Sequence, residues 1–457
     1  VMKLAPYPEY KDSGQPFLGD IPAHWNLFRN GRLFSQRNET GFGELPILEV
    51  SLKTGVRVRD MENLKRKQVM ADREKYKRAA QGDIAYNMMR MWQGAVGVAP
   101  IDGLVSPAYV VVRPFPEVDC RYYSYLFRTA SYMNEVDAYS RGIVKDRNRL
   151  YWQDFKRMPS PVPSIEEQRH ITTFLDAVGS KAQRFIRNKR RLIELLKEQK
   201  QNVINQAVTR GLDPKVKFKP SGVEWIGDIP EHWEVRRLKF LCHNLNEQTS
   251  EKQPGETYIA LEHVESWTGR ISLPDDEITF DSQVKRFQPG DVLFGKLRPY
   301  LAKVTRPQTA GVCVGEFLVL RATGDVSADF LEQKLRSKRV IDLINSSTFG
   351  AKMPRADWTF IGNLKFAYPP ADEQREILEH IQEKSAEIDQ AIIRAQREIE
   401  LMQEYRTRLI SDVVTGQVDV RGIEVPEIAD EELLSLDEDT ADADDVIDDE
   451  GEMDETD

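Results

Sequence analysis

The chain has 457 residues, of which 40% are hydrophobic and 30% charged, and its formal net charge is −10. This length predicts several domains, and the longest apolar runs, such as residues 108–112, are far shorter than the roughly 20 residues of a membrane-spanning helix. Three scattered cysteines, Cys120, Cys242 and Cys313, support neither a disulfide framework nor a zinc site, and they predict a reducing, cytoplasmic location.

A tandem repeat sets the order of the predicted elements. Residues 13–25 and 221–233 are identical at eight of thirteen positions, and both windows contain Gly-Asp-Ile-Pro-x-His-Trp. Further matches follow in the same order, including a Glu-Gln-Arg triplet that starts at Glu167 in the first copy and at Glu373 in the second. One unit of about 207 residues is therefore duplicated, and each copy consists of a globular part followed by a helix.

The two globular parts cover residues 1–162 and 213–369. In both, short runs of β-branched and aromatic residues alternate with Gly-Asp, Pro-Gly and Arg-Pro turns. This pattern predicts an α+β fold for each part and leaves its topology open. The predicted strands are residues 47–51, 109–112, 258–261, 292–294 and 317–320, and the predicted short helices are residues 122–132 and 328–335.

A long helix follows each globular part, at residues 163–212 and 370–418. In the first helix, Ser164 and Glu167 have the spacing of a capping box, apolar residues recur every three or four positions, and Gly211 can end the helix. We expect the two helices to pack as an antiparallel coiled coil, because the intervening globular part brings the chain back. Two unrelated helices, each lying on its own domain, are the alternative.

The last segment, residues 426–457, is predicted to be a disordered acidic tail. From residue 427 onward it contains 17 acidic residues, no Lys or Arg and no aromatic residue. Without these 17 charges the formal net charge of the chain changes from −10 to +7. The body is therefore mildly basic. The tail is interpreted as a solubilising extension, with an autoinhibitory mimic of DNA as the alternative.

No catalytic motif is found in the sequence. It contains no glycine-rich phosphate loop, no dinucleotide fingerprint, no His-Glu-x-x-His and no cysteine pair at metal spacing. The acidic run at residues 274–277 lacks the nearby Glu-x-Lys of a metal-dependent nuclease. The repeated His-Trp, at residues 24–25 and 232–233, is interpreted as structural, with the tryptophan anchoring a domain and the histidine capping a turn. A surface that contacts a partner is the alternative.

Basic residues interleaved with aromatic ones mark both globular parts and indicate DNA binding. Lys and Arg neutralise phosphates, and Arg also reads base edges in the major groove. A single basic run is usually a solvated face, but here the same regions are enriched in both copies. The candidates are Lys53, Arg57, Arg59, Arg90, Arg141, Lys145, Arg147 and Arg149 in the first part, and Lys285, Arg286, Lys296, Arg298, Tyr300, Lys303, Lys352 and Arg355 in the second.

With these features the chain resembles the specificity subunits of type I restriction-modification systems. The resemblance rests on the repeated Gly-Asp-Ile-Pro-x-His-Trp, the Glu-Gln-Arg that opens each long helix, and Gly-Asp-Val-Leu-Phe-Gly-Lys-Leu-Arg-Pro-Tyr-Leu at residues 290–301. It implies that the globular parts are target recognition domains that read the two halves of a bipartite, asymmetric DNA site. The coiled coil would separate these domains and set the spacer between the half-sites.

The resemblance also implies partners. Two modification subunits, which bind S-adenosylmethionine and methylate adenine N6, would dock on the conserved helical regions. Restriction subunits, which are translocases that use ATP and Mg, would join through them. The chain itself would then be non-catalytic and hold no cofactor or metal. The candidate partner-binding residues are Trp25, Trp233, Glu167, Gln168, Arg169, Glu373, Gln374 and Arg375.

Within the candidate interface, Lys145 and Lys352 are expected to contact phosphate, whereas Arg90 and Arg298 are expected to contact bases or their near surroundings. Two other hypotheses stay open. One is a DNA-binding scaffold or regulator that acts without a methyltransferase. The other is a single-chain nuclease whose carboxylates do not form a familiar motif.

Overall fold

The computed structural model describes residues 4–52, 55–59, 73–142, 148–273, 283–350 and 353–425. The chain forms two compact units. Unit 1 is discontinuous and combines the residues up to Lys189 with those from Arg397 onward, whereas unit 2 is continuous from Arg190 to Gln396. The acidic tail, residues 426–457, lies outside the described residues.

The main sheet of unit 1 is antiparallel, with strand order β4-β11-β8-β9. Val110 and Val112 of β11 face a core shared with α2 and α3, and Tyr109 and Val111 face a smaller core. Both faces of this strand are therefore buried, as its continuous apolar sequence indicates. The elements are β1 (Tyr10–Asp12), β2 (Asp20–Pro22), β3 (Asn26–Arg29), α1 (Asn30–Leu33), β4 (Phe34–Arg37), β5 (Leu48–Ser51), β6 (Gly55–Val58), β7 (Lys77–Ala79), β8 (Ile84–Asn87), β9 (Val96–Val98), β10 (Gly103–Val105), β11 (Tyr109–Pro114), α2 (Cys120–Phe127), α3 (Ala130–Tyr139), α4 (Trp152–Phe155) and β12 (Pro159–Val162).

Unit 2 repeats this framework. Its corresponding sheet has the order β16-β23-β20-β21, and a second sheet has the order β17-β19-β22-β18. In β23, Leu318 and Leu320 face the core with α6 and α7, and Phe317 and Val319 face the smaller core. The elements are β13 (Phe218–Pro220), β14 (Asp228–Pro230), β15 (Glu234–Arg237), β16 (Cys242–Leu245), β17 (Gln248–Thr249), β18 (Thr257–Ile259), β19 (Val284–Phe287), β20 (Val292–Gly295), β21 (Val304–Thr305), β22 (Gly311–Val314), β23 (Phe317–Ala322), α6 (Ala328–Arg336), α7 (Lys338–Ser346), α8 (Trp358–Asn363) and β24 (Lys365–Tyr368).

One predicted helix is divided in two. Residues 122–132 were expected to be continuous, but α2 ends at Phe127 and α3 begins at Ala130. The division occurs because the Thr129 side chain accepts a hydrogen bond from the Tyr132 amide at 3.3 Å, which caps a new helix.

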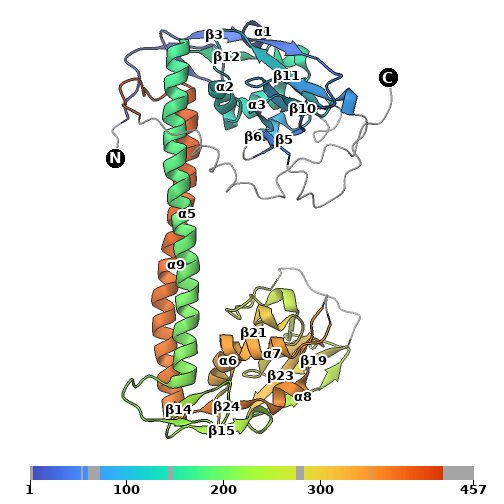
Figure 1. Ribbon diagram of the computed structural model, residues 1–457, viewed down its shortest axis with the longest axis vertical. Coiled ribbons are helices and arrows are strands. Elements are labelled where there is room, and N and C mark those ends of the chain that lie inside the picture. The colour runs from blue at the N-terminus through green and yellow to red at the C-terminus, as the bar shows by residue number, and fades with distance from the viewer. Residues whose placement is uncertain are drawn as a thin grey trace. The chain divides into compact units, whose positions relative to one another are not determined.

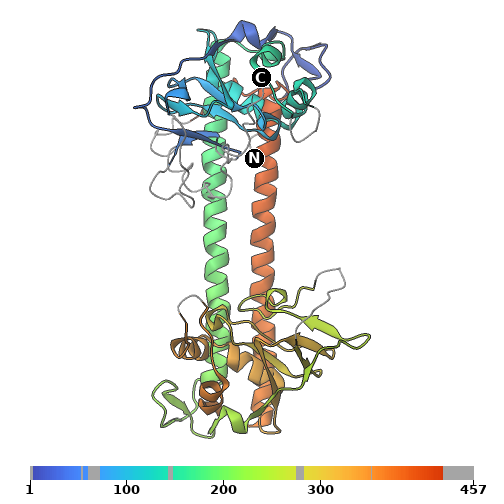
Figure 2. The ribbon, with the colours of Figure 1, turned by 90° about the vertical axis from the view of Figure 1, so that its right-hand side faces the viewer.

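Two long helices, α5 (Ile165–Arg210) and α9 (Ala371–Val414), follow the globular parts. They have 46 and 44 residues and lie within the predicted segments 163–212 and 370–418. In each unit, a stretch of α5 lies beside a stretch of α9 (Figures 1 and 2). Gly211 and Gly416 follow the helix ends with φ values of +73° and +80°, a left-handed conformation that glycine adopts without strain.

The two long helices pack antiparallel in both units. The core of unit 1 joins Ile171, near the start of α5, with Val413, near the end of α9. The core of unit 2 joins Val208, near the end of α5, with Ile377, near the start of α9. The expected antiparallel pairing is confirmed, and the alternative of two unrelated helices is wrong. Ion pairs also link the helices, Lys189 with Glu398 in unit 1 and Lys200 with Asp389 in unit 2.

In each globular part, a side chain from a short helix binds the C-terminal turn of one long helix. In unit 1, the Tyr122 hydroxyl of α2 donates to the Val414 carbonyl oxygen at 2.8 Å. In unit 2, the Lys334 ammonium of α6 donates to the Val208 carbonyl oxygen. Carbonyls in the last turn of a helix have no partner within the helix, so both bonds satisfy groups that would otherwise be buried without one.

The buried Lys334 makes the stability of unit 2 depend on pH. Burial lowers the pKa of its ammonium from 10.5 to about 7. Between pH 7 and 10.5 the unfolded chain binds a proton that the folded chain does not, so the Lys334 contribution lowers stability progressively as pH falls through this window. We expect K334M to flatten this slope, as measured by hydrogen exchange of the α6 amides. The control K338M removes an exposed lysine of α7 and should keep the wild-type slope.

Candidate nucleic-acid interface

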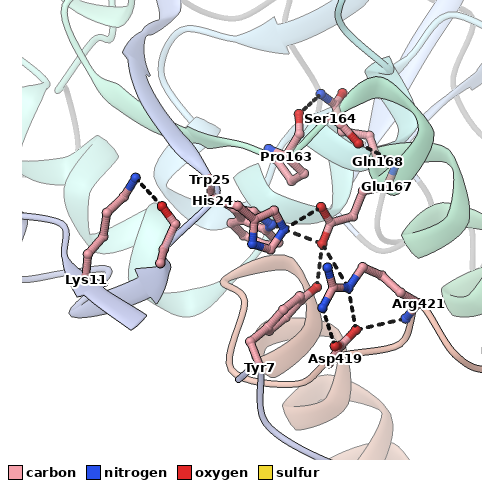
Figure 3. Close-up of polar contacts among 11 residues, drawn as sticks. Tyr7, Lys11, His24, Trp25, Pro163, Ser164, Glu167, Gln168, Asp419 and Arg421 are labelled. Atoms are coloured by element: carbon pink, nitrogen blue, oxygen red, sulfur yellow. Dashed lines mark hydrogen bonds and ion pairs between the residues drawn. The ribbon is translucent and has the colours of Figure 1, made fainter. Parts of the chain in front are cut away.

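The repeated His-Trp and Glu-Gln-Arg motifs meet in space. In unit 1, the fully buried Trp25 donates its indole N–H to Glu167 Oε1 at 3.1 Å, and His24 Nε2 lies 2.9 Å from Oε2 (Figure 3). The Tyr7 hydroxyl donates to the same carboxylate at 2.8 Å, and its own pKa is raised by burial and by this negative charge. The carboxylate therefore joins the start of α5 to the globular part.

The capping box of α5 forms only in part. Ser164 Oγ accepts a hydrogen bond from the Glu167 amide at 3.2 Å, as the spacing predicts. The Glu167 carboxylate instead binds Trp25 and His24. The imidazole contacts this carboxylate and does not cap a turn as expected, whereas the structural role of the buried tryptophan agrees with its interpretation as an anchor.

Unit 2 has the same contacts between the His-Trp motif and the first turn of a long helix, but its glutamate is more exposed. Trp233 donates its indole N–H to Glu373, with both carboxylate oxygens at 3.1 Å, and His232 Nε2 lies 2.6 Å from Oε2. The Glu373 side chain is 22% exposed, whereas that of Glu167 is 5% exposed. The glutamine after each glutamate is also internal. Gln168 accepts from the Asp119 amide and Gln374 from the Ser327 amide, both at 2.9 Å.

These contacts place most of the candidate partner-binding residues inside the protein. Trp25, Trp233, Glu167, Gln168 and Gln374 are buried, and Glu373 is intermediate. Arg169 and Arg375, the third residues of the two triplets, are exposed. Partner binding by these eight residues stays a prediction. Arg169 and Arg375 are the two of them whose side chains are exposed and could contact a partner.

Several candidate DNA-binding cations are used inside their own domains. Lys285 is 9% exposed, donates to the Phe317 carbonyl oxygen at 2.9 Å, and has a pKa lowered by burial. Lys285 lies on the same face of β19 as the buried Phe287, so its side chain faces the interior, which a count of basic residues in the sequence does not reveal. The other internal contacts are Arg57 and Arg59 with Glu49 at 2.7 and 3.7 Å, Arg286 with Glu256 at 3.2 Å, and Lys303 with the Leu261 carbonyl oxygen at 2.6 Å. These five placements differ from the exposed basic surface that the sequence predicts. Four further candidates, Lys53, Lys145, Arg147 and Lys352, lie outside the described residues.

The remaining candidates of unit 2 lie in two neighbouring loops, residues 296–302 and the described residues 348–350 and 353–357, which we call loop pair 2. The Arg298 amide donates to the Pro354 carbonyl oxygen at 2.8 Å, and the Ala356 amide donates to the Lys296 carbonyl oxygen at 2.9 Å. Leu297 and Arg355 form a β-bridge. These backbone bonds hold together two segments that are more than fifty residues apart in the chain.

Unit 1 has the equivalent arrangement in residues 88–94 and the described residues 140–142 and 148–151, which we call loop pair 1. The Leu150 amide donates to the Met88 carbonyl oxygen at 2.8 Å, as Ala356 does to Lys296 in unit 2. Arg141 and Arg149 form a β-bridge with reciprocal bonds of 3.0 and 2.9 Å. Arg90, Arg141 and Arg149 are exposed in this pair. The duplication therefore brings the candidate arginines of each copy onto one small surface.

Arg298 has an unusual backbone conformation. Its φ and ψ are 51° and 59°, in the left-handed region that non-glycine residues rarely adopt, and Pro299 follows it. Its side chain is exposed, and no ion pair involves it within the described part of the chain. Residues held in strained backbone conformations concentrate at functional sites. Arg298 is therefore the strongest candidate of loop pair 2 for contact with DNA.

Each loop pair also contains an arginine held by a carboxylate. Arg355 lies 2.8 Å from Glu316 with 57% of its side chain exposed, and Arg141 pairs with Asp154 with 66% exposed. A guanidinium that is oriented by one carboxylate and open to solvent can still bind a phosphate or a guanine edge in a bidentate manner. The described surface thus offers both fixed and unpaired guanidinium groups.

The sequence interpretation did not single out two exposed apolar residues of loop pair 2, Phe349 and Met353. A signal was present, since Phe349 is the repeat counterpart of Arg141, which was among the candidates. Within the described ranges, no group of three or more His, Cys, Asp or Glu side chains could hold a metal ion. No helix among the same residues combines the length and apolar character needed to cross a bilayer.

Comparison with protein-family models finds no match. The chain is 23% identical over 248 residues to the type I restriction enzyme EcoDI specificity subunit of Escherichia coli, a match that covers 50% of this chain and 55% of that protein. The chain thus spans about half the length of this relative. It is 22% identical over 433 residues to the putative type I restriction enzyme MjaX specificity subunit of Methanocaldococcus jannaschii, covering 88% of this chain and 96% of that one.

A similar fold is found in a chain from a structure that describes complex assembly and conformational transition of the type I R-M system. The TM-score is 0.62 and the sequence identity 15%, with 86% of this chain and 98% of the other covered. At this identity the likeness establishes a shared fold. The α+β architecture with paired long helices is confirmed, and so is the resemblance to type I specificity subunits.

Proposed function

We propose that the chain is the DNA-specificity subunit of a type I restriction-modification complex. The observation that carries this proposal is the duplication of one arginine-bearing loop pair on two α+β domains. A repeated frame with different loop side chains suits a protein that reads two different half-sites. The similarity to specificity subunits over most of the chain supports the same function.

Each target recognition domain reads one half of a bipartite, asymmetric site. Arg90 and Arg149 in unit 1, and Arg298 in unit 2, supply exposed guanidinium groups for base edges or phosphates. Neighbouring backbone bonds fix the loops that present them, so the groups are oriented before DNA binds. The paired helices set the number of unspecified base pairs between the two half-sites.

The catalytic steps belong to partner subunits in this proposal. Two modification subunits supply S-adenosylmethionine and methylate adenine N6, and restriction subunits supply ATP-driven translocation with Mg. Arg169 and Arg375, exposed in the first turns of α5 and α9, are candidate contacts for the modification subunits. The chain itself acts by recognition and holds no cofactor.

A DNA-binding scaffold that acts without a methyltransferase is the second hypothesis that the exposed arginines allow. The two hypotheses predict different partners for the chain. Isolation of the full chain with a bound methyltransferase subunit supports a specificity subunit, whereas sequence-specific DNA binding by the chain alone, with no such partner, supports the scaffold. A single-chain nuclease would instead cleave DNA in a metal-dependent reaction without any partner.

Exchange of the first recognition domain tests the proposed function directly. Replacing residues 14–160 with the corresponding domain of another specificity subunit is expected to change one half of the methylated site and leave the other half intact. Sequencing of methylated adenines in host DNA measures the outcome. The donor domain should retain His-Trp at the positions of His24 and Trp25, because Glu167, outside the exchanged segment, binds both side chains.

The reciprocal exchange of residues 221–368 serves as the control and should change the other half. A change in both halves, or in neither, after the first exchange would contradict the assignment of one domain to one half-site.

A further inference from the structure

Loop pair 2 exposes a group of large apolar side chains to solvent. Phe349 is 76% exposed, the largest value among the exposed large apolar residues of the described chain. Met353 and Tyr300, in the same loop pair, are 58% and 44% exposed. Single exposed apolar residues are common, but several of them together with polar groups mark a binding surface.

The backbone that carries Phe349 is fixed. Its amide donates to the Arg355 carbonyl oxygen at 3.2 Å, and the Arg355 amide donates to the Phe349 carbonyl oxygen at 3.0 Å. Arg355 also forms the bridge to Leu297, which ties this segment to the other loop of the pair. The aromatic ring is therefore presented from a constrained position, so little backbone entropy is lost when it makes a contact.

Loop pair 2 also carries positively charged side chains, in addition to the exposed ring of Phe349. Arg298 is exposed, the Arg355 side chain is 57% exposed, and Lys296, at the start of the first loop, is partly exposed. This combination fits the major groove of DNA, in which phosphates line the edges and the thymine C5-methyl is the apolar group displayed by the base pairs. Phenylalanine is one of the side chains that contact this methyl group.

Comparison of the two copies shows that the residue at this position differs, whereas the backbone bonds around it are the same. Phe349 corresponds to Arg141 in unit 1, and both residues form the same β-bridge, with Arg355 and Arg149 respectively. Asp154, which pairs with Arg141, corresponds to Phe360 in unit 2. The duplicated loops thus keep their backbone bonds but replace a charged pair with two aromatic residues. Such a change suits domains that read different bases, because arginine favours guanine and an apolar ring favours thymine.

We propose that Phe349 is a specificity-determining residue that contacts the C5-methyl group of a thymine in the half-site read by the second domain. The inference rests on the proposed function and deepens it, since it assigns one base type to one residue. Arg298 and Arg355 hold the DNA on either side of this contact. The equivalent position of the first domain, Arg141, reads its half-site by hydrogen bonds.

A thymine-to-uracil scan tests this contact, because deoxyuridine lacks only the C5-methyl group and keeps the base-pairing edge. The full chain in complex with methyltransferase subunits is titrated against duplexes in which each thymine of the second half-site is replaced in turn. We expect one replacement to weaken wild-type binding about threefold to tenfold. In F349A the same replacement should change binding by less than about twofold.

The control is F240A, which truncates another exposed phenylalanine of unit 2, 61% exposed and outside loop pair 2. It should retain the wild-type ratio of thymine to uracil affinity. Thermal unfolding of both variants should match that of the wild type, because both rings lie largely in solvent.

The inference is overturned if F349A keeps the wild-type ratio at every thymine, if F240A loses it as well, or if no thymine of the second half-site affects wild-type binding. These results leave the proposed function intact as long as the wild-type complex binds its bipartite site. Failure of the wild-type complex to bind any specific site, with no change of half-site after domain exchange, rejects the proposed function itself.

Discussion

Replacing Trp25 by alanine is expected to lower the free energy of unfolding of unit 1 by about 3–5 kcal/mol. The indole is fully buried in the main core, and its N–H donates to the buried Glu167 carboxylate. Truncation removes the packing of a large ring and also deprives a buried carboxylate of a donor. Because a typical domain is stable by only about 5–15 kcal/mol, this change should leave unit 1 near its unfolding threshold.

Chemical denaturation followed by hydrogen exchange of the α2 amides would measure this loss in unit 1. The control Y151A truncates an exposed aromatic residue, 43% exposed, and should change stability by less than about 0.5 kcal/mol. The variant W25F keeps an aromatic ring and removes the N–H donor, so it should fall between the two. Equal stability of W25A and Y151A would contradict the anchoring role of Trp25.

The second large effect is expected on DNA binding, when the Arg298 side chain is removed. Removing the Arg298 guanidinium should weaken specific binding of the complex roughly 10- to 100-fold and relax the base preference in one half-site only. Because Arg298 has a φ of 51°, glycine is the better replacement, since it adopts this conformation without strain. Removing the Arg90 guanidinium, at the equivalent position of loop pair 1, should relax the other half-site.

Competition binding against duplexes with single base changes in each half measures both preferences. The control R236A removes an arginine of unit 2 that pairs with Glu234 and Asp325 and lies outside loop pair 2. It should preserve the base preference in both halves. If R298G weakened all sequences equally, and only reduced the dependence of binding on salt, Arg298 would be a phosphate contact instead.

The fold was largely predictable because its main signals are local or repeated. The apolar periodicity of α5 and α9, the glycines that end them and the duplicated motifs all lie in short stretches of sequence. The antiparallel pairing followed from the position of a whole domain between two helices. The break between α2 and α3 was not predicted, because a threonine such as Thr129 can either continue a helix or cap a new one. Here its side chain accepts a hydrogen bond from the Tyr132 amide, so it caps α3.

The candidate site was less predictable because exposure and pairing depend on contacts between distant residues. In the sequence, Lys285 and Arg298 are equivalent candidates, since both are cations of one basic segment. In the structure, Lys285 is buried and Arg298 is exposed to solvent. Arg355 reaches loop pair 2 through a bridge to Leu297 that no local pattern indicates. Phe349 was missed since the search followed charge, although its alignment with Arg141 already marked the position.

The discontinuity of unit 1 has a consequence for biosynthesis. Its core includes Leu409, Val413 and Val420, which are translated after all of unit 2. Domains near the N-terminus usually fold first as the chain emerges from the ribosome, but this one must wait until its last apolar residues have been made. Unit 2, continuous from Arg190 to Gln396, can complete its own core earlier. Of the two units, the one whose synthesis starts first is thus the last to complete its core.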